Sequence, residues 1–133
     1  MPKYVSCGVM LFFRSKVLLV KEERSKHWGF PKSRFNEGET EQEAALRGVK
    51  DVTGLTVELI PDFRFVSKYH YRAGSERVDQ EIILFMAEAP TDKIPGITEA
   101  GTFCKWFLPH KTVDATTFTE VVPALENALK KEI

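Results

Sequence analysis

The apolar residues of this chain gather in β-rich runs separated by turn signals, a pattern that favours β-strands. The hydrophobic runs cover residues 4–13, 16–22, 56–72, 76–88 and 104–108. Only Arg14 and Ser15 separate the first two runs, which predicts a β-hairpin. The turn signal Ala73-Gly74-Ser75 predicts a second hairpin, and residues 90–101, which contain Pro and Gly, predict a loop before the last strand.

A helix over residues 40–53 is signalled at both ends. At its start, Thr40 and Glu43 have the spacing of a capping box, in which each side chain accepts a hydrogen bond from the other residue's backbone N–H group. At its end, Gly54 can adopt the left-handed conformation that terminates many helices. The apolar side that we expect to pack on the core consists of Ala45, Val49 and Val52.

A second helix is predicted near the end of the sequence. Over residues 117–131, the apolar residues Val121, Leu125 and Leu129 recur every four positions. Several strands with two helices far apart in the sequence predict an α/β/α sandwich around a mixed β-sheet. No repeat, low-complexity tract or long linker divides the sequence, so we expect residues 1–133 to form a single domain.

Composition restricts the possible partners and the compartment. The hydrophobic fraction of 43% and the charged fraction of 29% are ordinary for a globular domain. The 19 basic and 19 acidic residues give a formal net charge of zero, which argues against nucleic acid as a partner, and no apolar run is long enough to span a membrane. Cys7 and Cys104 lie in apolar runs without metal-ligand spacing, so we expect buried, reduced thiols in a cytoplasmic protein.

The strand residues 63–72 alternate between an aromatic face and a basic face. The aromatic face includes Tyr69 and Tyr71, which could stack on a nucleobase. The basic face includes Lys68 and Arg72, which could contact phosphate groups. These four residues are therefore candidates for substrate binding. The alternative is an antiparallel strand whose aromatic residues pack on the core and whose basic residues face solvent.

Residues 33–55 resemble a Nudix box, the signature of the Nudix family. The family pattern is a Gly, five residues, a Glu, seven residues, then Arg-Glu, an aliphatic residue, any residue, Glu-Glu, any residue, Gly and an aliphatic residue. The positions of this chain that match the pattern are Glu39, Arg47, Val49, Gly54 and Leu55. Ser33 stands where the family has its first Gly. The resemblance implies a Nudix fold and a Glu39–Arg47 ion pair that ties down the loop before the helix.

The family's metal-binding and catalytic carboxylates fall on Gly48, Asp51 and Val52 of this chain. Residues at these spacings lie on one side of a helix. Three carboxylates there would suit Mg²⁺, which prefers oxygen ligands and commonly bridges carboxylates to phosphates. The resemblance makes Asp51 and Glu39 the candidate ligands for Mg²⁺ or Mn²⁺; a solvated Asp51 is the alternative. Replacing Gly48 and Val52 together by Glu is expected to create or raise Mg²⁺-dependent hydrolysis.

Within the family, the chain is most similar to the asymmetrical diadenosine tetraphosphate hydrolases. The similarity rests on His-Trp-Gly-Phe-Pro-Lys at residues 27–32, directly before the box, and on Lys-Trp-Phe-Leu at residues 105–108, followed by Phe118. In such enzymes the lysine that matches Lys32 contacts the phosphate chain. The resemblance therefore implies Lys32 and Trp28 as candidates for substrate binding.

A glutamate in the loop before the late Trp of these enzymes assists at the metal. Glu99 is the corresponding candidate, although it lies slightly further from Trp106 than the family spacing. Packing in the core or at a sheet edge is the alternative for Trp28 and Trp106.

Three functions remain open. The first, which we expect, is a protein that binds a nucleoside polyphosphate such as diadenosine tetraphosphate and hydrolyses pyrophosphate bonds weakly or not at all, because Gly48 and Val52 replace box acids. The second is an active Mg²⁺-dependent dinucleoside polyphosphate hydrolase with a rebuilt metal site. The third is an RNA- or protein-binding module on the same fold. The candidate catalytic residues are Asp51, Glu39 and Glu99, and Glu43 could contribute to the rebuilt site.

Overall fold

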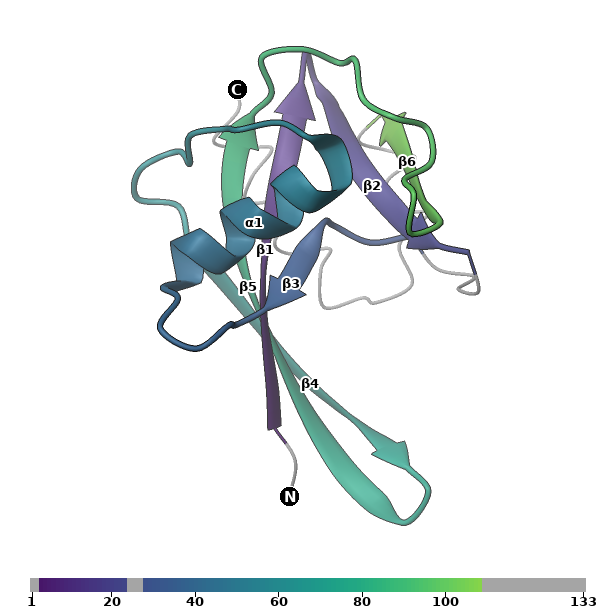
Figure 1. Cartoon of the computed structure of the whole chain (residues 1–133). Coiled ribbons are helices and arrows are strands. Elements are labelled where there is room, and N and C mark those ends of the chain that lie inside the picture. Colours follow the sequence, from purple (N-terminus) through teal and green to yellow (C-terminus); the bar gives the residue numbers. More distant parts are fainter. Residues whose placement is uncertain (1–2, 24–27, 109–133) are drawn as a thin grey trace.

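The computed structural model describes residues 3–23 and 28–108. This part of the chain holds one α-helix and six strands that form a single sheet (Figure 1). The elements are β1 (Lys3–Phe13), β2 (Lys16–Glu22), β3 (Lys32–Arg34), α1 (Glu41–Thr53), β4 (Phe65–Ala73), β5 (Glu76–Glu88) and β6 (Thr102–Phe107).

The sheet is mixed, with the order β4-β5-β1-β2-β6, and the short β3 pairs with β1. β1 and β5 run parallel, whereas the other pairs are antiparallel. At the turn between β1 and β2, Arg14 and Ser15 have φ angles of 47° and 70°. Left-handed values of this kind are required by the tight turns whose twist matches that of a hairpin. The hairpin predicted at these two residues is confirmed.

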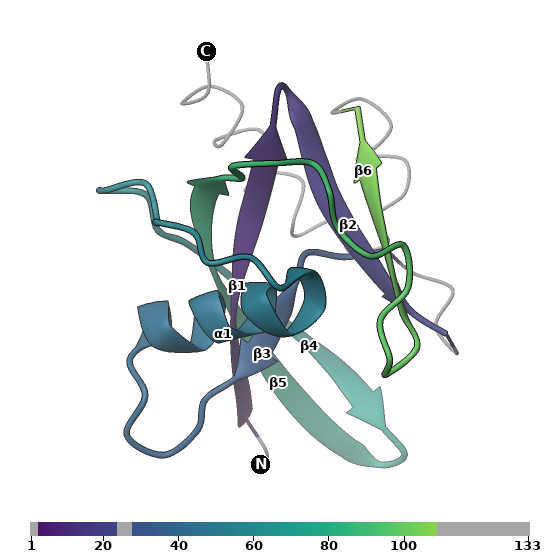
Figure 2. The ribbon, with the colours of Figure 1, turned by 45° about the horizontal axis from the view of Figure 1, so that its top comes forward.

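Both faces of the sheet are buried. Successive strand residues point to opposite faces, so Val9 and Leu11 of β1 belong to one core, whereas Met10 and Phe12 belong to the other. α1 lies across the first of these faces (Figure 2). The fully buried residues that the helix contributes to this core are Ala44, Ala45 and Val49.

α1 has both of its predicted ends. Thr40 Oγ1 accepts a hydrogen bond from the Glu43 N–H at 3.1 Å, and Glu43 Oε1 accepts one from the Thr40 N–H at 2.9 Å. Gly54 follows the helix with a φ of 77°, and its N–H donates to the carbonyl of Lys50 at 2.8 Å. Val52 is partly buried against the core on the α1 side, as its place in the apolar pattern predicts.

The strand predicted over residues 56–72 is wrong for its first part, because β4 begins only at Phe65. Pro61 has no N–H group to offer a neighbouring strand, and Asp62 has a φ of 66°, so a turn interrupts the segment. Val57 is nevertheless buried in the core beside α1. Its apolar character therefore reflects packing rather than strand pairing.

The hydrophobic pattern of the sequence also fails to predict β3, and it places the start of β6 slightly too late. β3 consists of three polar residues and forms by pairing with Ser6–Gly8 of β1, a contact between distant parts of the sequence. β6 begins at Thr102, ahead of the predicted start, and ends at Phe107. The predicted loop over residues 90–101 is confirmed.

The helix predicted over residues 117–131 lies outside the described residues, and so do Phe118 and His27. A mixed sheet covered by α1 confirms the α/β class, and the second helical layer stays a prediction. Cys7 and Cys104 are free and buried, as predicted. Burial, with a smaller effect from the Glu41 carboxylate, raises the pKa of the Cys7 thiol to about 11. Within the described ranges, no helix is long and apolar enough to cross a membrane.

Candidate functional site

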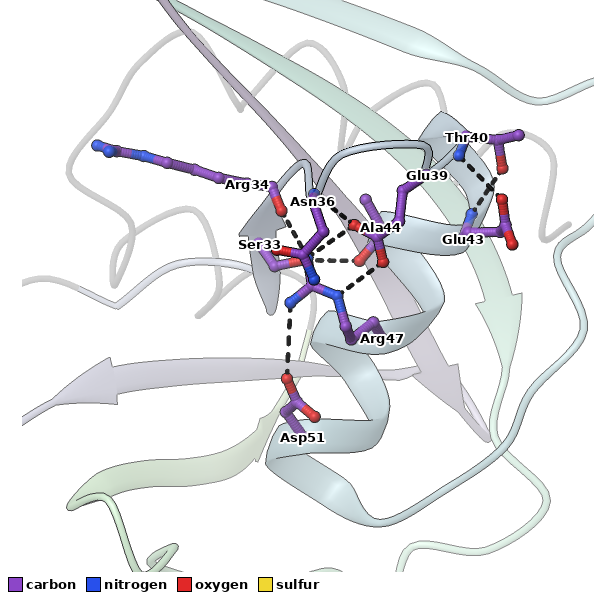
Figure 3. Close-up of polar contacts among 9 residues, drawn as sticks. All are labelled: Ser33, Arg34, Asn36, Glu39, Thr40, Glu43, Ala44, Arg47 and Asp51. Atoms are coloured by element: carbon purple, nitrogen blue, oxygen red, sulfur yellow. Dashed lines mark hydrogen bonds and ion pairs between the residues drawn. The ribbon is translucent and has the colours of Figure 1, made fainter.

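The Glu39–Arg47 pair predicted from the box is present and has two contacts (Figure 3). Arg47 Nε donates to Glu39 Oε2 at 2.8 Å, and Arg47 Nη2 donates to Glu39 Oε1 at 2.9 Å. The same Nη2 donates to the carbonyl of Arg34 at 2.6 Å, and Glu39 Oε1 also accepts the Asn36 N–H at 2.7 Å. The pair therefore fastens the loop between β3 and α1 to the helix.

This network occupies both carboxylate oxygens of Glu39. The hydrogen bond from Arg47, with that from Asn36, holds the pKa of the Glu39 carboxyl at about 2, well below its ordinary 4.5. The opposite side of Arg47 faces Asp51, whose Oδ2 lies 3.9 Å from Nη1. The geometry explains Glu39 as a residue that orders the loop; its role as a metal ligand stays a prediction.

The three carboxylate positions of the box are now visible in space. Gly48 is buried, and Val52 is partly buried in the core beside α1. Asp51 points outward, with 66% of its side chain exposed. Mg²⁺ requires several oxygen ligands in near-octahedral geometry, and two of these three side chains offer no oxygen. Of the three box positions, only Asp51 can therefore offer a carboxylate to Mg²⁺.

Asp51 and Glu99, which come from distant parts of the sequence, line the same surface hollow of about 470 Å³. The hollow lies between the C-terminal end of α1 and the loop before β6. Its lining residues are Lys50, Asp51, Val52, Thr53, Gly54, Pro95, Ile97, Thr98, Glu99 and Ala100. Among residues 3–23 and 28–108, no three His, Cys, Asp or Glu side chains gather closely enough to hold a metal ion. The structure thus brings two predicted catalytic residues to one hollow.

Three further polar residues line the hollow, Lys50, Thr53 and Thr98, and none of them was predicted from the sequence as a site residue. Lys50 stands on the same helix as Asp51, and its proximity to that residue was the only available signal. No sequence signal pointed to Thr98, because its position depends on how the loop folds back onto β6. There, the Thr98 N–H donates to the carbonyl of Thr102 at 2.9 Å.

Lys32 opens β3 and lies opposite Gly8 of β1 in the sheet register. The residue as a whole is exposed. The surrounding protein nevertheless desolvates its ammonium group and lowers its pKa from the ordinary 10.5, an effect that the nearby Glu22 carboxylate opposes. A partly desolvated cation of this kind interacts more strongly with an anion than a fully hydrated one does.

Trp28 and Trp106 both have structural explanations. Trp28 is half-buried, and its ring meets Phe107 edge-on at 5.2 Å between centroids. Trp106 packs near Phe13 at 6.1 Å between centroids, and its Nε1 donates to the carbonyl of Asp92 at 3.0 Å. These contacts favour the packing alternative for both residues, and contact between Trp28 and a ligand stays a prediction.

The four candidates on β4 belong to the β4–β5 hairpin, and Lys68, Tyr71 and Arg72 do not line the hollow. β1 pairs with β5 only from Asp79 onward, so the hairpin tip extends past the end of β1 (Figure 1). Tyr71, on this extension, is 45% exposed. The side chain of Tyr69 lies outside the described part of the structure.

The basic face of β4 meets acidic residues on its partner strand. Lys68 pairs in register with Glu81, and Arg72 pairs with Arg77, which itself forms an ion pair with Asp79 at 3.0 Å. Cross-strand opposite charges stabilise a sheet modestly. Lys68 and Arg72 remain exposed. The register places an acidic residue opposite Lys68 but a basic residue opposite Arg72, so of these two candidates only Lys68 faces an opposite charge across the strands.

Comparison with known proteins agrees with this architecture. A family model described as the NUDIX domain matches residues 2–127. The fold is similar to that of a C. elegans Ap4A hydrolase in a binary complex, with a TM-score of 0.72 and 18% identity over 98% of this chain and 99% of that one. It is also similar to the E. coli dihydroneopterin triphosphate pyrophosphohydrolase, with a TM-score of 0.70 and 18% identity over 98% and 99% of the two chains.

A MutT protein from Bacillus halodurans gives a TM-score of 0.71 and 15% identity over 92% of this chain and 80% of that one. At identities this low, the structural similarity shows a shared fold. The family model, in contrast, matches nearly all of the sequence. Together with the α1 caps and the Glu39–Arg47 pair at their expected places, these matches show that the chain belongs to the NUDIX domain family.

Proposed function

We propose that this protein binds a nucleoside polyphosphate, such as diadenosine tetraphosphate, and hydrolyses its pyrophosphate bonds weakly or not at all. One contrast carries the proposal. Lys32 is an exposed lysine that opens β3 directly before the box, whereas box positions 48 and 52 hold a buried Gly and a core-packed Val. The cationic element suited to phosphate is thus present, and most of the acidic element suited to catalysis is absent.

Phosphate binding and the pKa of Lys32 are coupled in this proposal. Desolvation disfavours the charged form of the ammonium group, and an adjacent phosphate favours it. Binding should therefore raise the pKa of Lys32 and stabilise the folded state. The other candidates for ligand contact rank second. Trp28 packs against Phe107, Lys68 lies opposite Glu81, the side chain of Tyr69 is not described, and Tyr71 and Arg72 are exposed residues near the tip of the β4–β5 hairpin.

Slow Mg²⁺- or Mn²⁺-dependent hydrolysis is the second candidate function. It is favoured by Asp51 and Glu99, two carboxylates that line one hollow. A metal site with two carboxylates should support slower hydrolysis than one with three, because a single positioned acid or base contributes about 10²- to 10⁴-fold to a rate. This candidate therefore predicts a low rate that depends on both residues.

The test is equilibrium binding of diadenosine tetraphosphate to the unmodified protein, Lys32→Ala and Lys16→Ala. Lys16 is an exposed lysine at the start of β2, so its removal changes the net charge equally. We expect Lys32→Ala to weaken binding by about tenfold or more, because charge-assisted hydrogen bonds contribute about 1.5–3 kcal/mol, and Lys16→Ala to have little effect.

Product assays with Mg²⁺, with Mn²⁺ and with a chelator separate the two candidate functions. Binding without turnover supports the first, and slow turnover that is lost in Asp51→Asn and Glu99→Gln supports the second. No binding, or equal loss in the two lysine variants, would refute the role of Lys32.

A further inference from the structure

Two glycines from different elements lie directly against the backbone around Lys32. A Cβ atom added at Gly48 of α1 would stand 3.1 Å from the Lys32 carbonyl carbon, 3.3 Å from its Cα and 3.3 Å from the backbone nitrogen of Ser33. A Cβ added at Gly8 of β1 would stand 2.7 Å from the carbonyl oxygen of Pro31 and 2.9 Å from Lys32 Cβ. A side chain at Gly8 would therefore clash with this segment, and a side chain at Gly48 would fit only if the backbone of Lys32 and Ser33 moved by a few tenths of an ångström.

Gly48 costs the helix about 1 kcal/mol relative to Ala, because glycine loses more backbone entropy on folding. The close approach to β3 gives a reason for it. On the same side of α1, the Ser33 hydroxyl donates to the carbonyl of Ala44 at 2.6 Å. This hydrogen bond holds β3 against the helix, and Gly48 one turn later allows the backbones to meet.

Gly8 performs the same task from within the sheet. It lies opposite Lys32 in the register of β1 and β3. The next residue, Val9, donates its N–H to the carbonyl of Pro31 at 3.1 Å, the same carbonyl that a Gly8 side chain would strike. A glycine inside a strand often marks such a close approach of another backbone.

We propose that Gly48 and Gly8 are positioning residues that set where the Lys32 side chain stands and hence how tightly it holds a phosphate chain. The phosphate part of this inference rests on the proposed function. It follows that a side chain at position 48 would press on the backbone of Lys32, which would have to shift by a few tenths of an ångström to make room. The absence of a carboxylate at position 48 is then linked to the position of the Lys32 ammonium group.

The test is Gly48→Ala, which adds one methyl group and no charge. Displacing the Lys32 backbone by a few tenths of an ångström should weaken binding of diadenosine tetraphosphate by about tenfold, since small misplacements of a contact group carry large penalties. In the ligand-free protein, NMR titration of Lys32 should show that the pKa of its ammonium group has moved towards 10.5 as desolvation is relieved.

Gly29→Ala is the matched control, because Gly29 belongs to the same segment and a Cβ there would meet nothing within 4 Å. Gly29→Ala should leave both the affinity for diadenosine tetraphosphate and the pKa of Lys32 unchanged. A double-mutant cycle adds a second criterion. If Gly48 acts through Lys32, then Gly48→Ala should cause no further loss of binding in a Lys32→Ala background.

Ser33→Ala serves as a second variant that adds no bulk to the core. It removes the hydrogen bond to Ala44 and should also shift the Lys32 titration. An unchanged Lys32 titration in both folded variants, or an additive double-mutant cycle, would overturn the inference. If the unmodified protein binds no nucleotide but Lys32 shifts as expected, the positioning role holds and the proposed function fails.

Discussion

Val52→Glu is the change that most directly tests why hydrolysis should be weak. Val52, Asp51 and Glu99 line one hollow, so the substitution would bring a third carboxylate to two that already lie there. The equivalent change at position 48 is less informative, because a side chain there meets the backbone of Lys32 at 3.1 Å. The structure thus favours the single variant over the double replacement suggested by the box.

The cost to stability follows from the surroundings of Val52. It is partly buried in the core beside α1, and full burial of such a side chain contributes about 1.5–3 kcal/mol. We therefore expect a loss of about 1–2 kcal/mol. The new carboxylate can reach solvent in the hollow. The Mg²⁺-dependent rate should rise by about tenfold to hundredfold. This gain is at or below the lower end of the range for a positioned acid or base, because position 48 still carries no carboxylate.

The assay is product release from diadenosine tetraphosphate with and without Mg²⁺, using Val52→Gln as the matched control. Glutamine has the same shape as glutamate and the same cost to the core, but it carries no charge. A rise in rate in Val52→Glu alone, abolished by a chelator, is the expected result. If a folded Val52→Glu protein that still binds nucleotide is no faster than Val52→Gln, the missing acids do not explain weak hydrolysis.

Three further predictions concern the scaffold of the site. Because the pKa of Glu39 is about 2 in the folded protein and 4.5 ordinarily, its contribution to stability is fully present above pH 4.5 and is lost as the pH falls towards 2. The difference in unfolding free energy between the unmodified protein and Glu39→Gln, measured by urea titration, should therefore shrink over that interval; a constant difference would contradict the role of the Arg47 contact. Thr40→Ala should cost about 1 kcal/mol by removing the N-cap, seen as a lower melting temperature, and an unchanged value would mean that the cap is not formed in solution. Gly54→Ala should cost about 1 kcal/mol or more, because only glycine adopts the left-handed C-cap without strain; chemical denaturation showing no loss would exclude that conformation.

Local signals carried most of what the sequence could predict. The capping box of Thr40 and the C-cap at Gly54 involve residues only a few positions apart, and both are present in the structure. The Arg14-Ser15 turn likewise depends on its own backbone angles. Short-range chemistry of this kind can be read from the chain alone. The Glu39–Arg47 pair was implied by the resemblance to the Nudix family and is also present.

What the sequence could not predict depends on contacts between distant segments. β3 has no apolar alternation and exists because β1 offers it a partner edge. The mid-helix Gly48 had no explanation in its own neighbourhood, and its reason lies in the backbone of Lys32. The basic face of β4 could be recognised, but the residues of β5 that face it, Glu81 opposite Lys68 and Arg77 opposite Arg72, required the register.

The parallel pairing of β1 with β5 has a consequence for how the protein is made. These strands form the middle of the sheet, yet β2, β3, α1 and β4 all lie between them in the chain. Non-local pairing is slow, because the entropy of closing a long loop must be overcome before any contact rewards it. During synthesis β1 therefore emerges from the ribosome before β5, and the edge of β1 that pairs with β5 stays unpaired in the meantime. Unpaired strand edges of this kind favour aggregation.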